Sequence, residues 1–367
     1  MKDFFWFILT IAVSTVLGLV LHRLKIPMGA MVGAMIAAAI LNIFTSHGVF
    51  YEGVRKVLQI STGAMIGSKI GKNEAKSIKN ILFATSILMV GMVLLNIIFG
   101  TAVYRFSKLD IATSLFAVTP GGASDMAVIS ADLGADTAYV GIMQMLRIIF
   151  IITILPLIFK YIVKKMNYRA PATIRTEDIS AEDNEDSAGG FQKLPHEAFR
   201  YNGRELLLLT GLFISSAAGG IILIILDVPA GAVIGAMIFA IIYSIICGKA
   251  VFPNVIRPYQ QILAGAYIGV SIDRSTIASL DTLLIPALIM FVGILFFVFG
   301  LSYIIHKVAK LDFVTSLLAC TPGGITEMSL LSEDFGADTA KIAIMQTTRL
   351  VLVILLFPGM LQIILAI

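Results

Sequence analysis

The amino-acid sequence predicts an all-α integral membrane protein built from two homologous units. Three observations support this: 58% of the 367 residues are hydrophobic, only 14% are charged, and the apolar residues occur in long runs. A run of about 20 apolar residues is long enough to cross a bilayer, and soluble domains carry about 25% charged residues. The runs cover residues 4–21, 28–43, 81–103, 139–162, 206–226, 231–247, 283–305 and 342–366. We therefore expect a multi-pass protein of the cell membrane.

A gapless offset of 202 residues aligns the two halves of the chain. The strongest block reads TPGGASDMAVISADLGADTA at 119–138 and TPGGITEMSLLSEDFGADTA at 321–340. Over residues 119–156, 18 of 38 positions are identical to their partners. Internal repeats of this kind define the whole fold. The alignment predicts a first membrane repeat at 1–165, a second at 203–367, and a polar, acidic segment at 166–202 that we expect to be a flexible cytoplasmic linker.

Composition argues against several functional classes. The two cysteines, Cys247 and Cys320, lie in apolar context and indicate neither a disulfide framework nor a thiolate metal site. The four histidines are scattered along the chain, so we expect no metal centre and no enzyme. The net charge of +4 suits a membrane protein with a basic cytoplasmic face. No basic patch or helix-turn-helix pattern is present, so nucleic acid is not an expected partner.

Each repeat is expected to contain the same elements in the same order. A span that ends before a proline is followed by a span rich in glycine and alanine, which suits close helix packing. A shorter, more polar element then carries Gln59 and Gly63 in the first repeat, and Gln261 and Gly265 in the second. A long apolar span, the Thr-Pro-Gly-Gly element and a final apolar span complete the unit. The polar third element is a further candidate for lining a site.

The Thr-Pro-Gly-Gly element cannot form an uninterrupted helix, because proline removes a backbone donor and glycine weakens the helix that follows. About ten residues flank the break on each side, so the segment forms either a re-entrant hairpin or one broken crossing. The hairpin gives five crossings per unit and inverted repeats. The broken crossing gives six crossings per unit and parallel repeats.

Loop charges favour the inverted arrangement. The positive-inside totals do not decide, with 18 Lys/Arg inside against 6 outside for inverted repeats with the N-terminus out, and 17 against 7 for parallel repeats. Matching loops are more informative. The loop after residue 67 carries four lysines, whereas its counterpart in the second repeat carries Asp273, Arg274 and Asp281. Opposite charge character in matching loops indicates opposite sides of the membrane.

The two breaks are expected to meet at a substrate site near the membrane midplane, as interrupted helices do in secondary transporters. Backbone NH groups freed at the glycines would serve as donors to an anion, and a helix that begins there adds partial positive charge. Nearby hydroxyl groups add polarity. The candidates are Thr119, Gly121, Gly122 and Ser124 in the first repeat and Thr321, Gly323, Gly324 and Thr326 in the second. The alternative is that the glycines serve only tight packing.

Two carboxylates follow the breaks at matching positions, Asp125 and Glu327. A charge at membrane depth costs roughly 2.5 kcal/mol or more, so it normally has a partner or a function. These groups would bind Na+ or carry a proton, or they would cap the new helix. Four further aspartates lie in the turn after the breaks and are expected to be structural: Asp132, Asp136, Asp334 and Asp338.

Two arginines lie about ten residues into the last apolar span of each repeat, Arg147 and Arg349. Gln144 and Gln346 precede them by three residues and share their helix face. At this depth a guanidinium group cannot easily reach the interface. Each arginine is therefore expected either to pair with the nearby carboxylate or to bind a substrate anion with its guanidinium fork.

With these motifs the chain resembles the membrane AbrB family, which is a duplicated hydrophobic unit. The carrying residues are Thr119-Pro120-Gly121-Gly122 with Asp125-Met126 and Thr321-Pro322-Gly323-Gly324 with Glu327-Met328, each followed by Gly-Ala-Asp-Thr-Ala and the Gln…Arg pair. The resemblance covers nearly the whole chain outside the linker. It implies a regulatory label, since the family is named after a proposed regulator, and some members are labelled ammonia monooxygenases. The architecture is also similar to that of citrate and glutamate symporters, at the level of fold alone.

The function predicted from the sequence is secondary active transport of a small, anionic solute, with Na+ or H+ as the coupling ion and no other cofactor. One alternative is a membrane sensor or regulator that affects gene expression indirectly. A membrane monooxygenase is a weaker alternative, because copper or iron chemistry needs clustered ligands. The expected partners are the solute and the lipid bilayer. The sequence leaves the oligomeric state open and allows a homodimer.

Overall fold

The structure is a computed structural model, and it describes most of both repeats. The described residues are 2–24, 28–165, 203–228, 230–247, 252–253, 256–278, 280–323, 328, 331–332 and 335–366. They form helices and short connections, and no strand occurs among them. The predicted linker at 166–202 and the candidates Gly324, Thr326, Glu327 and Asp334 lie outside the described residues.

The helices of the two repeats correspond along the chain. The first repeat contains α1 (Lys2–Arg23), α2 (Gly29–Thr45), α3 (Glu52–Gly67), α4 (Lys72–Phe106), α5 (Ile111–Val118), α6 (Ala123–Ser130), η1 (Ala131–Leu133), α7 (Thr137–Thr153) and α8 (Leu155–Lys165). The second contains α9 (Gly203–Ile225), α10 (Gly231–Ile246), α11 (Ile256–Val270), α12 (Arg274–Ala278), η2 (Leu280–Leu283), α13 (Leu284–Leu295), η3 (Phe296–Gly300), α14 (Leu301–Ala309), α15 (Phe313–Cys320) and α17 (Thr339–Ala366). The prediction of an all-α membrane protein with two units is confirmed.

Six of the described helical segments are long and apolar enough to cross a membrane. They are 2–23, 81–106, 137–163, 206–225, 284–309 and 339–364. Two shorter apolar helices, α2 and α10, complete the set of apolar spans predicted from the sequence. The last span of the first repeat divides into α7 and α8 just before Pro156, whereas α17 continues through Pro358. Proline at matching positions therefore interrupts one span and is tolerated in the other.

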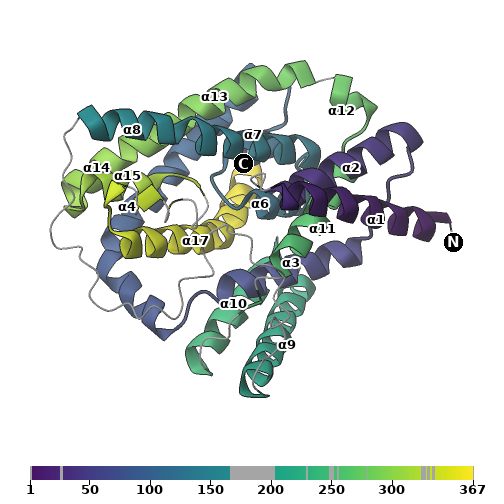
Figure 1. Ribbon diagram of the computed structural model, residues 1–367, viewed down its shortest axis with the longest axis horizontal. Helices are drawn as coiled ribbons and strands as arrows, with labels where there is room; N and C mark the ends of the chain where they lie inside the picture. Colours follow the sequence, from purple (N-terminus) through teal and green to yellow (C-terminus); the bar gives the residue numbers. More distant parts are fainter. Residues whose placement is uncertain are drawn as a thin grey trace.

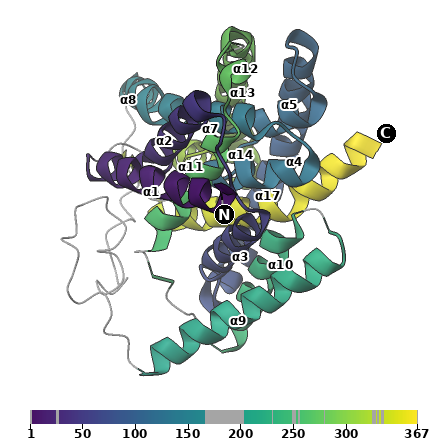
Figure 2. The same cartoon turned by 90° about the vertical axis from the view of Figure 1, so that its right-hand side faces the viewer.

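The helices form two groups, each with members from both repeats. We call α1–α3 and α9–α11 the panel, and α4–α8, α13–α15 and α17 the bundle. Within the panel α2 packs on α1 and α11, and α10 packs on α9 and α3. Figure 1 shows the panel on the right and below, and most of the bundle on the left. Figure 2 shows α9, α10 and α3 side by side. The site described below lies where α3, α6 and α11 bring the two groups together.

Small residues hold the two repeats together in the panel. A Cβ added at Gly63 would collide with the carbonyl oxygen of Val233, and one added at Gly265 would collide with that of Met31. These pairs are related by the offset of 202, so each repeat makes the same contact on the other. Such reciprocal contacts are the mark of a two-fold relation. The first repeat therefore packs on the second as the second packs on the first.

The direction of the contacting helices shows that the repeats are inverted. Gly63 meets Val233 and Gly67 meets Met237, so α3 and α10 run parallel. The connection 46–51 after α2 can span only about 20 Å, whereas α2 is about 25 Å long, so α3 must run back against α2. Parallel repeats would make α10 run with α2 and hence against α3. Because α3 runs parallel to α10 and antiparallel to α2, α10 runs antiparallel to its counterpart α2. The two repeats are therefore inverted.

The Thr-Pro-Gly-Gly element forms a re-entrant hairpin. Asp110 caps the start of α5 by accepting a hydrogen bond from the Thr113 backbone at 2.9 Å. After the return through α6, the backbone NH of Asp136 donates to Thr113 Oγ1 at 2.8 Å. The chain thus enters and leaves at the same level. Each arm has eight residues and reaches about 12 Å, so the break lies near the middle of a hydrocarbon core of about 30 Å.

The second repeat shows the same entry and exit. The NH of Asp338 donates to Thr315 Oγ1 at 3.1 Å, and Asp312 caps α15 through the Thr315 backbone at 2.8 Å. Asp136 accepts from the backbone of Ala138 at 2.9 Å, which confirms its predicted role as an N-cap. Both repeats therefore contain the re-entrant hairpin.

Replacing Gly63 by alanine is expected to lower the free energy of unfolding by about 1–3 kcal/mol, because the added methyl group overpacks the α3–α10 contact. Gly53 on the same helix has open space around it, so Gly53→Ala is the matched control. The control is expected to be neutral or stabilising, since alanine favours the helix by up to about 1 kcal/mol. Urea unfolding in detergent, followed by circular dichroism, measures both. Equal stability of the two variants would contradict the packing described for Gly63.

Candidate functional site

Both helix breaks face one cavity between the panel and the bundle. Its volume is about 190 Å³. Gly121 and Gly122 of the first break line it, as do Pro322 and Gly323 of the second. Its wall is completed by residues of α3, α6, α7, α11 and α17. The structure therefore brings the two breaks together, as the sequence predicted.

Arg147 holds the first break in place through its guanidinium group. Its Nη1 donates to the carbonyl oxygen of Thr119 and its Nη2 to that of Gly121, both at 2.6 Å. The side chain is 2% exposed. Carbonyl groups at the end of α5 lose their helical partners at the break, and they require donors because they are buried. Arg147 supplies two of these donors.

Arg349 does the same in the second repeat. Its Nη1 donates to Thr321 O at 2.9 Å and its Nη2 to Gly323 O at 3.4 Å. The sequence predicted either a carboxylate partner or a substrate anion for these guanidinium groups. The structure instead places backbone carbonyl oxygens there. Within the described part of the chain, Nε of Arg147 and of Arg349 has no hydrogen-bond partner, and both arginines line the cavity.

The two glutamines reinforce this arrangement. Gln144 donates to Phe116 O at 2.9 Å and to Thr119 O at 3.2 Å, and it does not line the cavity. Gln346 donates to Leu318 O at 2.9 Å and to Thr321 O at 2.8 Å, and it does line the cavity. Since the amide nitrogen of Gln346 is used by carbonyls, its Oε1 is the group left for a solute. The Gln…Arg pair is thus mainly a clamp on the helix break.

Two parts of the predicted donor set are wrong. The NH groups of Gly121 and Gly323 are not free, because they donate to Thr119 O at 3.0 Å and to Thr321 O at 2.8 Å. The hydroxyl groups of Thr119 and Thr321 turn back to carbonyls of their own helices, at 2.7 and 2.8 Å. Both threonines are fully buried and lie outside the cavity wall. A tight turn at each break satisfies its own polar groups locally, which the spacing of residues could not reveal.

Asp125 and Ser124 lie in the cavity wall at the start of α6. Ser124 Oγ donates to Asp125 Oδ1 at 3.2 Å. The carboxylate folds back over Gly122, where an added Cβ would collide with Oδ2. In the first turn of α6 this charge interacts favourably with the helix dipole. Asp125 therefore stabilises the start of α6 and also presents a carboxylate in the cavity wall.

Two cationic side chains stand at the mouth of the cavity. Lys69 follows the end of α3, and Arg257 lies in the first turn of α11, where it is exposed. Burial, and to a lesser degree the charge of Arg257, lower the pKa of Lys69 to about 8. The four cationic residues of the wall, Lys69, Arg147, Arg257 and Arg349, outnumber the one described carboxylate, Asp125. The cavity wall therefore carries an excess of positive charge.

Sequence reasoning missed Arg257 and Gln260, and it treated Lys69 only as a loop charge. Gln59 and Gln261, weaker candidates from the third element, do line the cavity, as Gln260 does. The offset of 202 gave a signal for Arg257, since it matches Arg55 at the start of the third helix. The roles of the described candidates in binding are taken up below.

Comparison with known proteins agrees with the duplicated architecture. The profile of the family described as "Transition state regulatory protein AbrB" matches residues 1–164 and again 52–365. The protein YhjN of Bacillus subtilis (strain 168) is 27% identical over 375 residues, covering 98% of this chain and 92% of that protein. The protein named "Putative regulator AbrB" of Escherichia coli (strain K12) is 24% identical over 353 residues, covering 94% and 92%. No solved structure matches the chain. This chain belongs to the AbrB family.

Proposed function

We propose that this protein is a secondary transporter of a small anionic solute. The observation that carries the proposal is the cavity of about 190 Å³ that residues of both interrupted hairpins line. Inverted repeats with broken helices at the membrane midplane are the architecture of alternating access. A cavity of about 190 Å³ suits a small solute rather than a peptide or lipid.

The charge of the wall selects an anion. Lys69 and Arg257 have no hydrogen-bonded carboxylate among the described contacts, so both can neutralise an entering solute. The Nε atoms of Arg147 and Arg349 are further donors that have no partner among the described residues, although each atom is itself buried. Charge-assisted bonds of this kind are about twice as strong as neutral ones. A small carboxylate or an inorganic oxyanion matches this set of donors.

Coupling to Na+ or H+ is assigned to Asp125. A carboxylate in a cavity of net positive charge supplies the one described anionic ligand for a cation. A cation bound there would enter together with the anionic solute, which keeps the cavity close to neutral. We place the mouth, with Lys69 and the lysine-rich start of α4, on the cytoplasmic side of the cell membrane, following the positive-inside rule.

Transport is tested with the purified protein in proteoliposomes. Small carboxylates and inorganic oxyanions are first screened for thermal stabilisation in detergent, and the anions that stabilise are then tested for flux under a Na+ or a proton gradient. Arg257→Gln is expected to slow uptake at low solute concentration about tenfold, because an exposed charge at the mouth mainly speeds entry. Arg105→Gln, at an exposed arginine of α4 outside the cavity, is the matched control. Absence of any stabilising anion, or equal flux in both variants, would refute the proposal.

A regulatory function is the second candidate, favoured by the name of the Escherichia coli relative. The two roles differ in what they require. A regulator needs the acidic segment at 166–202 or another surface to contact a partner, whereas a transporter needs the cavity. Deleting residues 170–200 should abolish signalling in the first case and spare anion binding in the second. A transporter can also change gene expression indirectly, through the concentration of its solute.

A further inference from the structure

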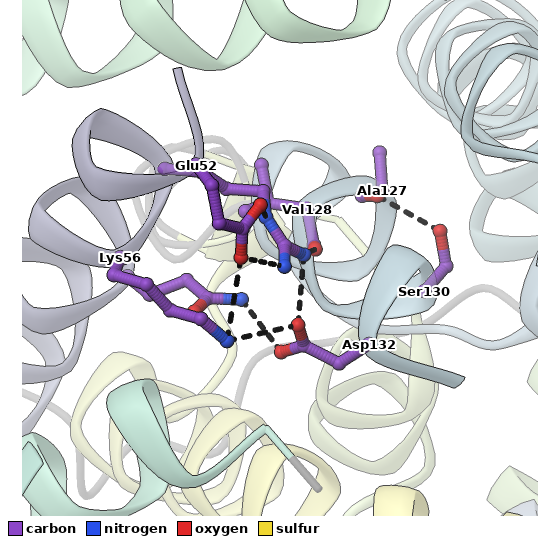
Figure 3. A network of polar contacts seen from close by, with 8 residues as sticks. Glu52, Lys56, Ala127, Val128, Ser130 and Asp132 are labelled. Carbon is purple, nitrogen blue, oxygen red and sulfur yellow. Dashed lines mark hydrogen bonds and ion pairs between the residues drawn. The ribbon is translucent and has the colours of Figure 1, made fainter. Parts of the chain in front are cut away.

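An ion cluster lies beyond the deep end of the cavity, away from Lys69 and Arg257. Arg55 Nη1 pairs with Asp132 Oδ1 at 2.8 Å, and Lys56 Nζ with the same oxygen at 3.2 Å. Glu52 binds Arg55 Nε at 2.8 Å and lies 3.7 Å from Lys56 Nζ. Figure 3 shows Glu52, Lys56 and Asp132 converging on one another. We call these four residues the ion cluster.

The ion cluster joins the two helix groups. Three of its members come from the first turns of α3 in the panel, and Asp132 comes from η1 at the end of the hairpin in the bundle. Arg55 Nη1 also donates to the carbonyl oxygen of Val128 on α6 at 3.4 Å. Gln59, which lines the cavity, donates to Asp132 Oδ2 at 2.8 Å. The ion cluster therefore ties the hairpin to the panel directly behind the cavity wall.

Beside Gln59, an apolar layer of three side chains lies between the ion cluster and the cavity. Leu58 of α3, Val128 of α6 and Ala264 of α11 pack together, and they are 2%, 3% and 1% exposed. All three also line the cavity. Tyr267 packs against this layer, with its ring 5.7 Å from the Arg55 guanidinium carbon. Water and ions meet a closed end here, formed by apolar side chains and then by paired charges.

Among the described residues, Arg257 of the second repeat differs from its counterpart in the ion cluster. Arg257 corresponds to Arg55 through the offset of 202, yet Arg55 is 7% exposed and paired, whereas Arg257 is exposed at the mouth of the cavity. Leu58 of the apolar layer corresponds to the polar residue Gln260, and both line the cavity. In inverted repeats, matching positions lie at opposite ends of the pathway. The end at Arg55 is therefore closed by paired charges, whereas the described arginine at the matching position of the other end, Arg257, is exposed.

We infer that the ion cluster is the closed gate of an alternating-access cycle, and that opening it separates Asp132 from α3. The inference rests on the proposed transport function. Opening would admit water to four charged groups that the closed gate partly desolvates, so hydration replaces the ion pairs that are lost. Exchange of the two repeats between their conditions would then bury Arg257 and release Arg55.

The inferred gate is tested by measuring from which side of the membrane a cysteine in the cavity can be labelled. Thr62 of α3 lines the cavity and is 7% exposed, so a small cysteine fits there. The native cysteines are first removed with Cys247→Ser and Cys320→Ala. A charged, membrane-impermeant methanethiosulfonate is then applied to intact cells and to inside-out vesicles that contain Thr62→Cys. We expect labelling from one side alone, the side of Lys69.

Adding Asp132→Asn is expected to raise labelling from the other side about tenfold, which is the shift that about 1.4 kcal/mol of lost closed-state stability produces. The double variant Arg55→Gln with Asp132→Asn removes both buried charges and should open the gate without leaving one unpaired. Labelling from the side of Lys69 must persist in each variant, which verifies that the protein is folded. Lys341→Gln breaks the ion pair with Asp338 at the start of α17, outside the cavity, and should change labelling from neither side.

Labelling that stays one-sided in both gate variants would overturn the inference. The measurement needs no transported solute, so its failure is separate from failure of the proposed function. If the protein is labelled as expected but moves no anion in proteoliposomes, the inferred gate is supported and the proposed solute is refuted. If the protein transports an anion but its gate variants are still labelled from one side only, the inferred gate is refuted and the proposed transport function is not.

Discussion

Arg147→Met is expected to lower the free energy of unfolding by about 2–4 kcal/mol. The buried carbonyl oxygen of Gly121 would lose its described donor, and that of Thr119 would lose the shortest of its three hydrogen bonds, at up to about 1–3 kcal/mol each. Removal of a buried charge offsets part of this loss. Arg349→Met should cost less, because one of its two bonds is 3.4 Å long against 2.6 Å in the first repeat. Urea unfolding of the purified variants in detergent measures the difference.

Arg105→Met is the control for the loss of an arginine at an exposed site, and it should leave stability unchanged. A stable Arg147→Met protein that has lost anion binding would contradict the clamp and restore the direct substrate contact predicted from the sequence. Arg147→Lys further distinguishes the clamp on the helix break from a direct contact with the substrate. A lysine keeps the charge, but it lacks the planar fork that reaches two carbonyl oxygens at once. It should recover anion binding only partly and stability only partly.

The sequence predicted the architecture well because the repeat is gapless and the helix break is chemically explicit. Pro120 cannot be accommodated in a continuous helix. Asp110 and Asp312, which match through the repeat, are the N-cap residues at the start of the two hairpins. The loop charges in the sequence favoured the hairpin over the crossing, but only indirectly. The choice is decided by a long-range hydrogen bond, from Asp136 NH to Thr113 Oγ1, that local pattern does not contain.

The partners of the buried polar groups could not be predicted. Spacing places Arg147 near the break, but it does not distinguish a carboxylate from a backbone carbonyl as the acceptor. The NH of Gly121 has the same difficulty, because its use in a tight turn depends on dihedral angles. Arg257 reaches the cavity only through the packing of α11 against α2 and α6, which is tertiary structure. Composition and the internal repeat thus predict the helical architecture, whereas tertiary packing determines which side chains line the cavity.

Anion affinity is expected to fall as the pH rises above about 8, because Lys69 then loses the charge that attracts the solute. Protonated Lys69 binds the anion, and the neutral amine does not, so the dissociation constant should rise about tenfold per pH unit above that pKa. A bound anion raises the pKa of Lys69, which moves the loss of binding to higher pH at saturating solute. Isothermal titration calorimetry between pH 6 and pH 10 with an anion from the stabilisation screen gives the profile.

Without anion, Lys69 should affect stability in the opposite direction. Its pKa in the folded protein is about 8, below the ordinary value of 10.5, so the unfolded state binds more protons between these values. Stability of the unliganded protein then rises with pH across this interval, while stabilisation by the anion declines. Lys69→Gln should remove both trends together, and Lys307→Gln, at an exposed lysine of α14 outside the cavity, should remove neither. If anion affinity in the unmodified protein stays constant up to pH 10, Lys69 does not contact the solute. The excess positive charge of the cavity wall would then act only through Arg257 and the two arginines that clamp the helix breaks, Arg147 and Arg349.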